Sequence, residues 1–118
     1  SAEVPRMYFA LDLHDDPQSI AEYERWHRPG QIWPEIVASI REAGVLDLEI
    51  FRTGNRLVLA MDVTDDFDGA AKAAADAANP HVQAWESLMD TFQQRLPWAK
   101  PGQKWVPMER IFSLRECP

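Results

Sequence analysis

The sequence has little that would tie it to an oxidising compartment or to a membrane. Its single cysteine is Cys117, next to the last of 118 residues, so no disulfide can close within the chain. The fold must therefore be stable without one, and a reducing, cytoplasmic setting is expected. No apolar stretch approaches the roughly 20 residues of a membrane helix, and no charged-then-apolar leader opens the sequence. We accordingly expect no membrane partner.

Basic residues are few and scattered. The chain has 12 lysines and arginines against 19 acidic residues, which gives a net charge of −7, and no two basic residues are adjacent. Such a chain repels a phosphate backbone, because no local basic patch offsets the negative charge. Nucleic acid is therefore not an expected partner.

The usual signatures of cofactor and metal chemistry are also missing. The sequence contains no G-x-G-x-x-G fingerprint, no P-loop and no G-x-S-x-G elbow of the kind found in many hydrolases. The three histidines, His14, His27 and His81, have none of the spacings that bind zinc, and the one cysteine forms no ligand pair. We expect no metal and no cofactor.

What the sequence does contain is the composition of one soluble globular domain over residues 1–118, with 46% hydrophobic and 26% charged residues. Four strands are predicted over residues 6–13, 45–52, 56–63 and 108–114, and four helices over residues 17–26, 34–43, 67–78 and 81–96. With each pair of helices counted as one crossover, this is the βαββαβ order of a ferredoxin-like α+β domain. The order predicts a four-stranded antiparallel sheet with helices on one face and a second copy of the chain on the other.

Tyr23 and His27 are the first candidates for chemistry. They stand four residues apart on a predicted helix, so they share a face, and His27 lies at the helix end, where it can titrate near neutral pH. A histidine beside a phenol, with indoles such as Trp33 nearby, resembles a sugar site, which is concave and aromatic. The alternative is structural: Tyr23 packs in an amphipathic helix, and His27 is a cation at the helix C-terminus. Spacing alone favours the structural alternative.

Trp85 and Glu86 are ambiguous in the same way. Helical spacing places Trp85 with Val82, Leu88 and Met89, which favours a core position. Glu86 follows directly and lies about 100° round the helix, which usually means solvent. Periodicity alone therefore gives neither residue a function.

Several segments together carry a resemblance to a known family. The run Y-E-R-W-H at residues 23–27, followed by I-W-P-E-I at residues 32–36, resembles the Y-x-x-x-H and I-W-P-E-L segments of the L-rhamnose mutarotase family. The likeness spans nearly the whole chain, because it continues through residues 48–51, 55–61, 83–85 and 108–114.

The resemblance implies a fold, a reaction and residue roles. Members of the family are dimeric α+β barrels of ferredoxin-like chains, and they interconvert the α and β anomers of a 6-deoxyhexose pyranose without a cofactor. His27 then matches the acid/base histidine, Tyr23 matches a sugar-binding tyrosine, and Trp85 matches the first residue of a Trp-Trp pair that contacts the sugar. A homodimer that acts on a monosaccharide is expected.

Three departures from the family pattern surround the acid/base histidine. Five residues separate His27 from Trp33, Glu86 replaces the second tryptophan of the pair, and Leu48 stands where the family has a sugar-contacting tyrosine. In the rhamnose enzymes only three residues separate the histidine from the tryptophan. Residues 27–35 instead resemble an H-x-P-G-x-x-W-P-E segment of members associated with fucose use. L-rhamnose and L-fucose are therefore both candidate substrates, with Leu48 and Glu86 as the positions that distinguish them.

Two other functions stay open at this point. Dimeric α+β barrels also host cofactor-independent oxygenases and haem-degrading enzymes, since a fold does not fix a function. In a haem-binding enzyme His27 would be an axial ligand. A non-catalytic module, in contrast, would bind the sugar without accelerating the exchange of its anomers.

Overall fold

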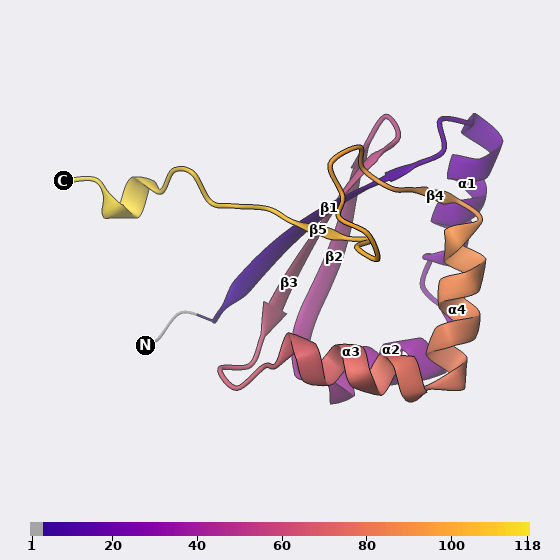
Figure 1. The fold of residues 1–118 in the computed structure, drawn as a ribbon, viewed down its shortest axis with the longest axis horizontal. Coiled ribbons are helices and arrows are strands. Elements are labelled where there is room, and N and C mark those ends of the chain that lie inside the picture. The colour runs from indigo at the N-terminus through magenta and orange to yellow at the C-terminus, as the bar shows by residue number, and fades with distance from the viewer. Residues whose placement is uncertain (1–3) are drawn as a thin grey trace.

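The computed structural model describes residues 4–118, and it has the α+β architecture that the sequence predicts (Figure 1). Helices pack on one face of an antiparallel sheet. Within the described residues the strands are β1 (Arg6–Leu13), β2 (Val45–Thr53), β3 (Arg56–Val63), β4 (Gln93–Gln94) and β5 (Val106–Pro107), and the α-helices are α1 (Pro17–Trp26), α2 (Pro34–Glu42), α3 (Gly69–Ala78) and α4 (Pro80–Asp90).

The sheet order is β2-β3-β1-β4, with β5 also paired to β1, so the sheet has five strands where four were predicted. Three long strands carry it, and the last two are short. Phe9 lies opposite Leu59, and Leu59 lies opposite Ile50, so these three side chains share the helix-facing side of the sheet. The predicted ferredoxin-like order is consistent with this topology. No helix among residues 4–118 is both long and apolar enough to cross a membrane.

Asn79 joins two helices that the sequence predicts separately. Its backbone N–H closes α3 by donating to the carbonyl of Asp76, and its side-chain oxygen accepts hydrogen bonds from the N–H groups of His81 and Val82, at 3.0 and 3.3 Å. Pro80 then occupies the first position of α4, where a missing N–H costs nothing. The chain turns between α3 and α4 at this residue. The helix α4 then runs from the end of α3 toward β4, on the side of the molecule opposite the C-terminus (Figure 1).

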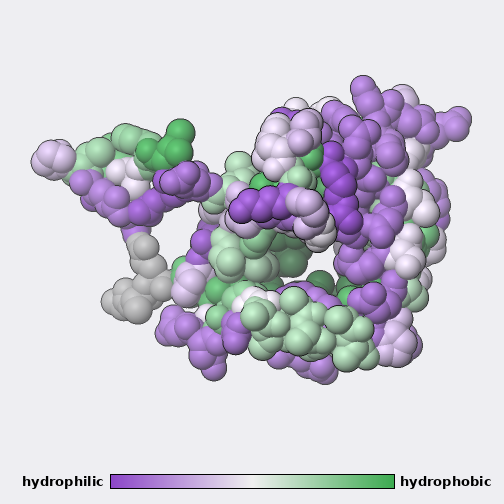
Figure 2. All heavy atoms as spheres, viewed as in Figure 1, coloured by the Kyte–Doolittle hydropathy of each residue, from purple (hydrophilic) through white to green (hydrophobic). Residues whose placement is uncertain are grey.

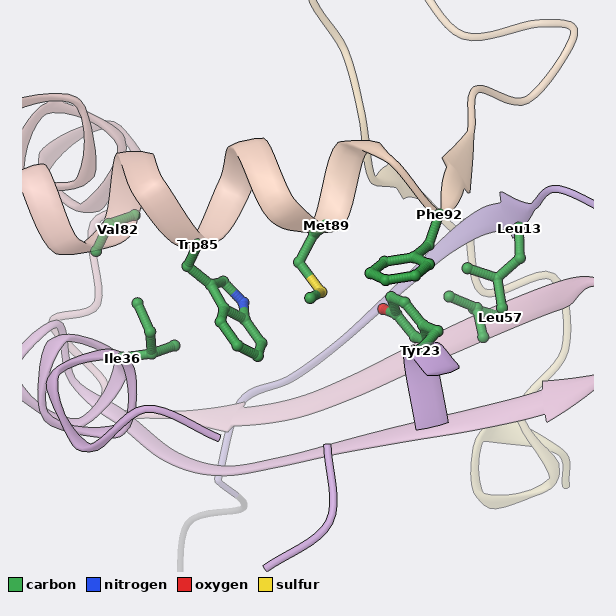
Figure 3. Close-up of a cluster of buried hydrophobic side chains, with 8 residues drawn as sticks. All are labelled: Leu13, Tyr23, Ile36, Leu57, Val82, Trp85, Met89 and Phe92. Carbon is green, nitrogen blue, oxygen red and sulfur yellow. The ribbon is translucent and has the colours of Figure 1, made fainter. Parts of the chain in front are cut away.

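The core lies between the sheet and the helices. Its largest cluster of buried side chains comes from β1, β3, the helices α1, α2 and α4, and the turn after α4 (Figure 3): Leu13, Tyr23, Ile36, Leu57, Val82, Trp85, Met89 and Phe92. A second cluster, of Val45, Leu59, Met61 and Val63, lies on the helix-facing side of β2 and β3. Burial of apolar side chains of this size contributes about 1.5–3 kcal/mol each. The first cluster therefore fixes α1, α2 and α4 over the sheet, and Ile40 of α2 packs against the second.

The prediction of a helix over residues 81–96 was wrong at its C-terminal end. The helix α4 ends at Asp90, because the chain turns at Phe92 and then pairs Gln93 and Gln94 with Leu13 and Asp12. Phe92 and Leu96 keep helical spacing in the sequence, and both are buried. They reach the core from a turn and a loop rather than from a helix, and hydrophobic periodicity does not distinguish the two.

The prediction of a last strand over residues 108–114 was also wrong. The pairing with β1 begins earlier, at Val106–Pro107 opposite Ala10 and Phe9, and its last contact is the N–H of Met108, which donates to the carbonyl of Tyr8 at 2.9 Å. Continuing this register would place residue 110 opposite Arg6, where β1 begins, so residues 111–114 have no partner on β1. Residues 109–118, here called the C-terminal arm, instead extend away from the body and contain only a short 3₁₀ helix, Leu114–Glu116 (Figure 1).

Candidate active site

One large cavity, of about 770 Å³, lies between the helix-facing side of the sheet and the helices. The space-filling view shows the molecule hollowed there, with hydrophobic residues on the inner wall (Figure 2). Its volume is in the range of small-molecule sites, about 300–1,000 Å³. The structure brings all five residues singled out in the sequence to its wall: Tyr23, His27, Leu48, Trp85 and Glu86.

His27 is the C-terminal cap of α1, as the sequence predicts, and its ring is partly buried. Its Nδ1 lies 2.6 Å from the backbone carbonyl oxygen of Tyr23. A carbonyl oxygen only accepts hydrogen bonds, so Nδ1 carries the proton and Nε2 of the neutral ring keeps a lone pair. Burial lowers the pKa of His27 below its ordinary value of 6.5, although the bond to the Tyr23 carbonyl opposes that shift. Near neutral pH the ring is therefore uncharged, with a basic nitrogen available.

Tyr23 reaches the cavity from the same helix, one turn before His27. It is 3% exposed, and the two rings lie 4.3 Å apart between centroids. Burial raises the pKa of Tyr23 to about 12; a hydrogen bond with Gln93 opposes the shift and the negative charge of Glu86 adds to it. The phenol therefore stays protonated near neutral pH, and can donate a hydrogen bond to a bound molecule.

Trp85 is both a core residue and a wall of the cavity. It is 6% exposed, and three aromatic rings meet it edge to face: His27 at 5.6 Å, Trp33 at 5.1 Å and Trp26 at 6.4 Å. A core position, which helical spacing favours, is thus compatible with a place on the cavity wall, which the family resemblance requires. Trp26 and Trp33 do not line the cavity but pack against Trp85, and edge-to-face contacts of this kind orient a ring.

Glu86 lies at the edge of the cavity, next to Trp85 on α4, and its side chain is half exposed. Its Oε2 is 2.5 Å from the ammonium group of Lys104, and that same ammonium lies 2.6 Å from a carboxylate oxygen of Asp90. One lysine thus ties the loop before β5 to two carboxylates on α4. Helical periodicity, which suggested solvent, accounts for the exposure of Glu86 but not for this contact.

Leu48 supplies an apolar part of the cavity wall. It lies on β2, paired with Met61 on β3, and is partly buried against the second core cluster. Its side chain shares the helix-facing side of the sheet with Ile50, so it faces the cavity.

Among the cavity residues that sequence reasoning missed are Gln93, Asp90, Lys104 and Trp105. Asp90 lies one helical turn after Glu86 on α4 and could have been found from that spacing. No motif marks the other three, which reach the cavity from β4 and from the segment around β5. Lys104, for example, is 18 positions from Glu86 and lies in a loop without periodicity. Among residues 4–118, no group of three or more His, Cys, Asp or Glu is placed to hold a metal ion.

Comparisons with known proteins point to a single family. The family model described as L-rhamnose mutarotase matches residues 6–114. An L-fucose mutarotase of Xanthomonas campestris is 58% identical over 112 residues, which cover 95% of this chain and 90% of the relative, and an L-rhamnose mutarotase of Acidiphilium cryptum is 53% identical, covering 89% and 95%. A crystal structure of an L-rhamnose mutarotase from Formosa agariphila superimposes with a TM-score of 0.64 at 26% identity, covering 93% of this chain and 98% of that one.

Proposed function

We propose, on the premise that this chain belongs to the L-rhamnose mutarotase family, that its cavity binds a 6-deoxyhexose and that His27 is the acid/base group of anomer exchange. The activity itself, interconversion of the α and β anomers of a sugar, is that of the family. The observation that carries the assignment of His27 is the bond from its Nδ1 to the Tyr23 carbonyl, which leaves Nε2 unprotonated.

The reaction needs only proton transfers. A base removes the proton from the O1 hydroxyl, the bond between C1 and the ring oxygen breaks as C1 becomes an aldehyde, and the ring oxygen receives a proton. Rotation about C1–C2 followed by closure gives the other anomer. His27 is the base through Nε2, and the protonated phenol of Tyr23 holds the sugar or relays a proton to it. General acid/base catalysis of this kind contributes about 10²–10⁴-fold.

We propose L-fucose as the preferred sugar. The L-fucose mutarotase of Xanthomonas campestris supports this choice, as do Leu48 and Glu86, which stand where the rhamnose-type pattern has aromatic residues. Trp85 offers an aromatic surface for the apolar side of the pyranose, and Leu48 adds an aliphatic one to the same cavity.

Saturation transfer between the α and β anomeric protons tests reaction and sugar together. The panel is L-fucose, L-rhamnose and other deoxyhexoses, each measured with and without protein. We expect the fastest catalysed exchange for L-fucose. A protein that binds a sugar without accelerating exchange would be a non-catalytic module, and a Soret band on addition of haem would favour the haem-binding alternative.

The exchange rate should fall in acid, with a midpoint below pH 6.5. Burial lowers the pKa of His27, so its basic form persists to more acidic pH than that of a free histidine. The rate is then flat above the midpoint and declines as the ring takes up a proton at Nε2. The check is the exchange rate of the preferred sugar between pH 4.5 and 8. A midpoint above 7 would contradict the basic role of a desolvated imidazole.

Glu86→Trp should shift the ratio of exchange rates toward L-rhamnose. The substitution restores an aromatic pair at residues 85 and 86 and removes the carboxylate that Lys104 contacts, leaving that lysine with Asp90. Both sugars are measured with both proteins. Glu42→Trp, at the exposed end of α2 and outside the cavity lining, is the matched control. An unchanged ratio would place Glu86 outside the sugar site.

We further infer that the protein is a homodimer of single-domain chains. Two exposed apolar surfaces support this: the C-terminal arm, in which Ile111 is 92% and Phe112 68% exposed, and the sheet face turned away from the helices, where Tyr8 and Phe51 are exposed. A second copy would cover both. A cytoplasmic location completes the proposal, supported by a lone, unpaired cysteine.

A further inference from the structure

Gln93 is the first residue of β4, and its backbone pairs with Leu13 of β1. Its side chain lines the same cavity as His27, Tyr23 and Trp85. The Nε2 of its amide lies 3.5 Å from the hydroxyl oxygen of Tyr23, while its Oε1 is buried and has no hydrogen-bond partner. In the part of the chain that the structure describes, residues 4–118, no other buried side-chain nitrogen or oxygen lacks one.

A buried amide oxygen without a partner is unusual, because buried polar atoms are almost always paired. Exchanging the oxygen and nitrogen of the amide does not remove the difficulty. In that orientation the Tyr23 hydroxyl donates to the oxygen, and the NH₂ group becomes the end without a protein partner. In either orientation this cavity-lining residue keeps one end of its carboxamide without a protein partner.

The neighbouring polar groups are already engaged. Lys104 holds Glu86 and Asp90, and Nδ1 of His27 holds the Tyr23 carbonyl. Nε2 of His27 is needed for the proton transfer itself. Gln93 is therefore a neutral polar residue of the cavity that takes part neither in the proposed proton transfer nor in the surrounding ion pairs.

We propose that the carboxamide of Gln93 binds a ring hydroxyl of the sugar and thereby helps to determine which 6-deoxyhexose is accepted. This inference rests on the proposed function. A hydroxyl both donates and accepts, so it can satisfy either end of an amide. L-fucose and L-rhamnose differ in configuration at C2 and C4, so a fixed amide meets the hydroxyl of one epimer and not that of the other. A site built to hydrogen-bond a hydroxyl discriminates strongly when the bond cannot form.

The test compares Gln93→Met, which keeps the length of the side chain and removes both polar ends, with Gln94→Met, its exposed neighbour on the same strand. Exchange rates for L-fucose and L-rhamnose are measured as a function of sugar concentration. We expect Gln93→Met to change the ratio of the two by about tenfold or more, mainly through weaker saturation by the preferred sugar, and Gln94→Met to leave it unchanged. Gln93→Glu, which replaces the donor end with a second acceptor and adds a negative charge, keeps the test available if Gln93→Met does not fold.

A purely structural role for Gln93, that of holding the Tyr23 ring, predicts a different result. Tyr23→Phe removes the hydroxyl that Gln93 contacts. If Gln93 only holds that ring, adding Gln93→Met to Tyr23→Phe has no further effect on the ratio of the L-fucose and L-rhamnose exchange rates. A ratio that still changes supports sugar binding. An unchanged ratio in every Gln93 variant, with wild-type exchange intact, overturns the proposal while leaving the mutarotase function in place. Absence of exchange in the wild type overturns both.

Discussion

His27→Asn is expected to lose most of the catalysed exchange, by about 10²- to 10⁴-fold. The asparagine amide can occupy the place of Nδ1 and still donate to the carbonyl of Tyr23, so the end of α1 keeps its hydrogen bond. What disappears is Nε2, the nitrogen with the lone pair. An amide does not take up protons near neutral pH, so the variant retains the local structure and loses the base. Saturation transfer with the preferred sugar measures the loss.

Two further variants make the result specific. His27→Gln places an amide nearer the position of Nε2, without the bond to the carbonyl, and should be equally inactive. His81→Asn changes an exposed histidine at the start of α4, outside the cavity lining, and should exchange at the wild-type rate. Circular dichroism checks that each variant is folded. Wild-type exchange in His27→Asn would rule out His27 as the acid/base group.

Phe112→Asp is expected to convert the proposed dimer into monomers, weakening association by at least about 100-fold. Each copy of the chain contributes one arm, so the substitution acts twice in a dimer. Removing a large apolar side chain from an interface loses about 1.5–3 kcal/mol per copy, and 1.4 kcal/mol corresponds to tenfold in Kd. Sedimentation equilibrium over a range of protein concentrations gives the Kd of both proteins.

Leu46→Asp is the control for this experiment. Leu46 lies on β2, away from the arm, and its exposure of 61% is close to the 68% of Phe112. If Phe112 lies at the interface because it is part of the arm, only its substitution dissociates the dimer. Dissociation of both variants would assign the effect to added negative charge on a chain that already carries −7, and a monomeric wild type would refute the homodimer.

The long elements could be predicted because their signals are local. The strand Arg6–Leu13 is a run of apolar residues that ends at a proline-containing turn, and Asn79 followed by Pro80 marks a helix start by capping chemistry alone. The end of α4 and the last strand were missed because neither is a local property. Phe92 leaves the helix to fill the core, and the pairing of the last segment depends on where β1 begins.

The residues of the candidate site also divide into those with a local sequence signal and those without one. His27 and Tyr23 could be paired from their four-residue spacing, and the family resemblance added Trp85, Glu86 and Leu48, all of which line one cavity. Gln93 and Lys104 could not be found, because a two-residue strand and an irregular loop carry them there, and no spacing in the sequence encodes that approach.

The proton on Nδ1 of His27 is held by an atom of the main chain. The position of this proton is therefore independent of the side chains proposed to select the sugar. The carbonyl of residue 23 is present whatever side chain that position carries, provided that α1 ends one turn later. On the proposed function, substitutions in the cavity wall therefore alter which sugar is accepted without disturbing the proposed base. Over evolutionary time the preference for a sugar is free to drift while the reaction is inherited. Relatives named for two different sugars, at 58% and 53% identity to the same chain, are the pattern that such an arrangement permits.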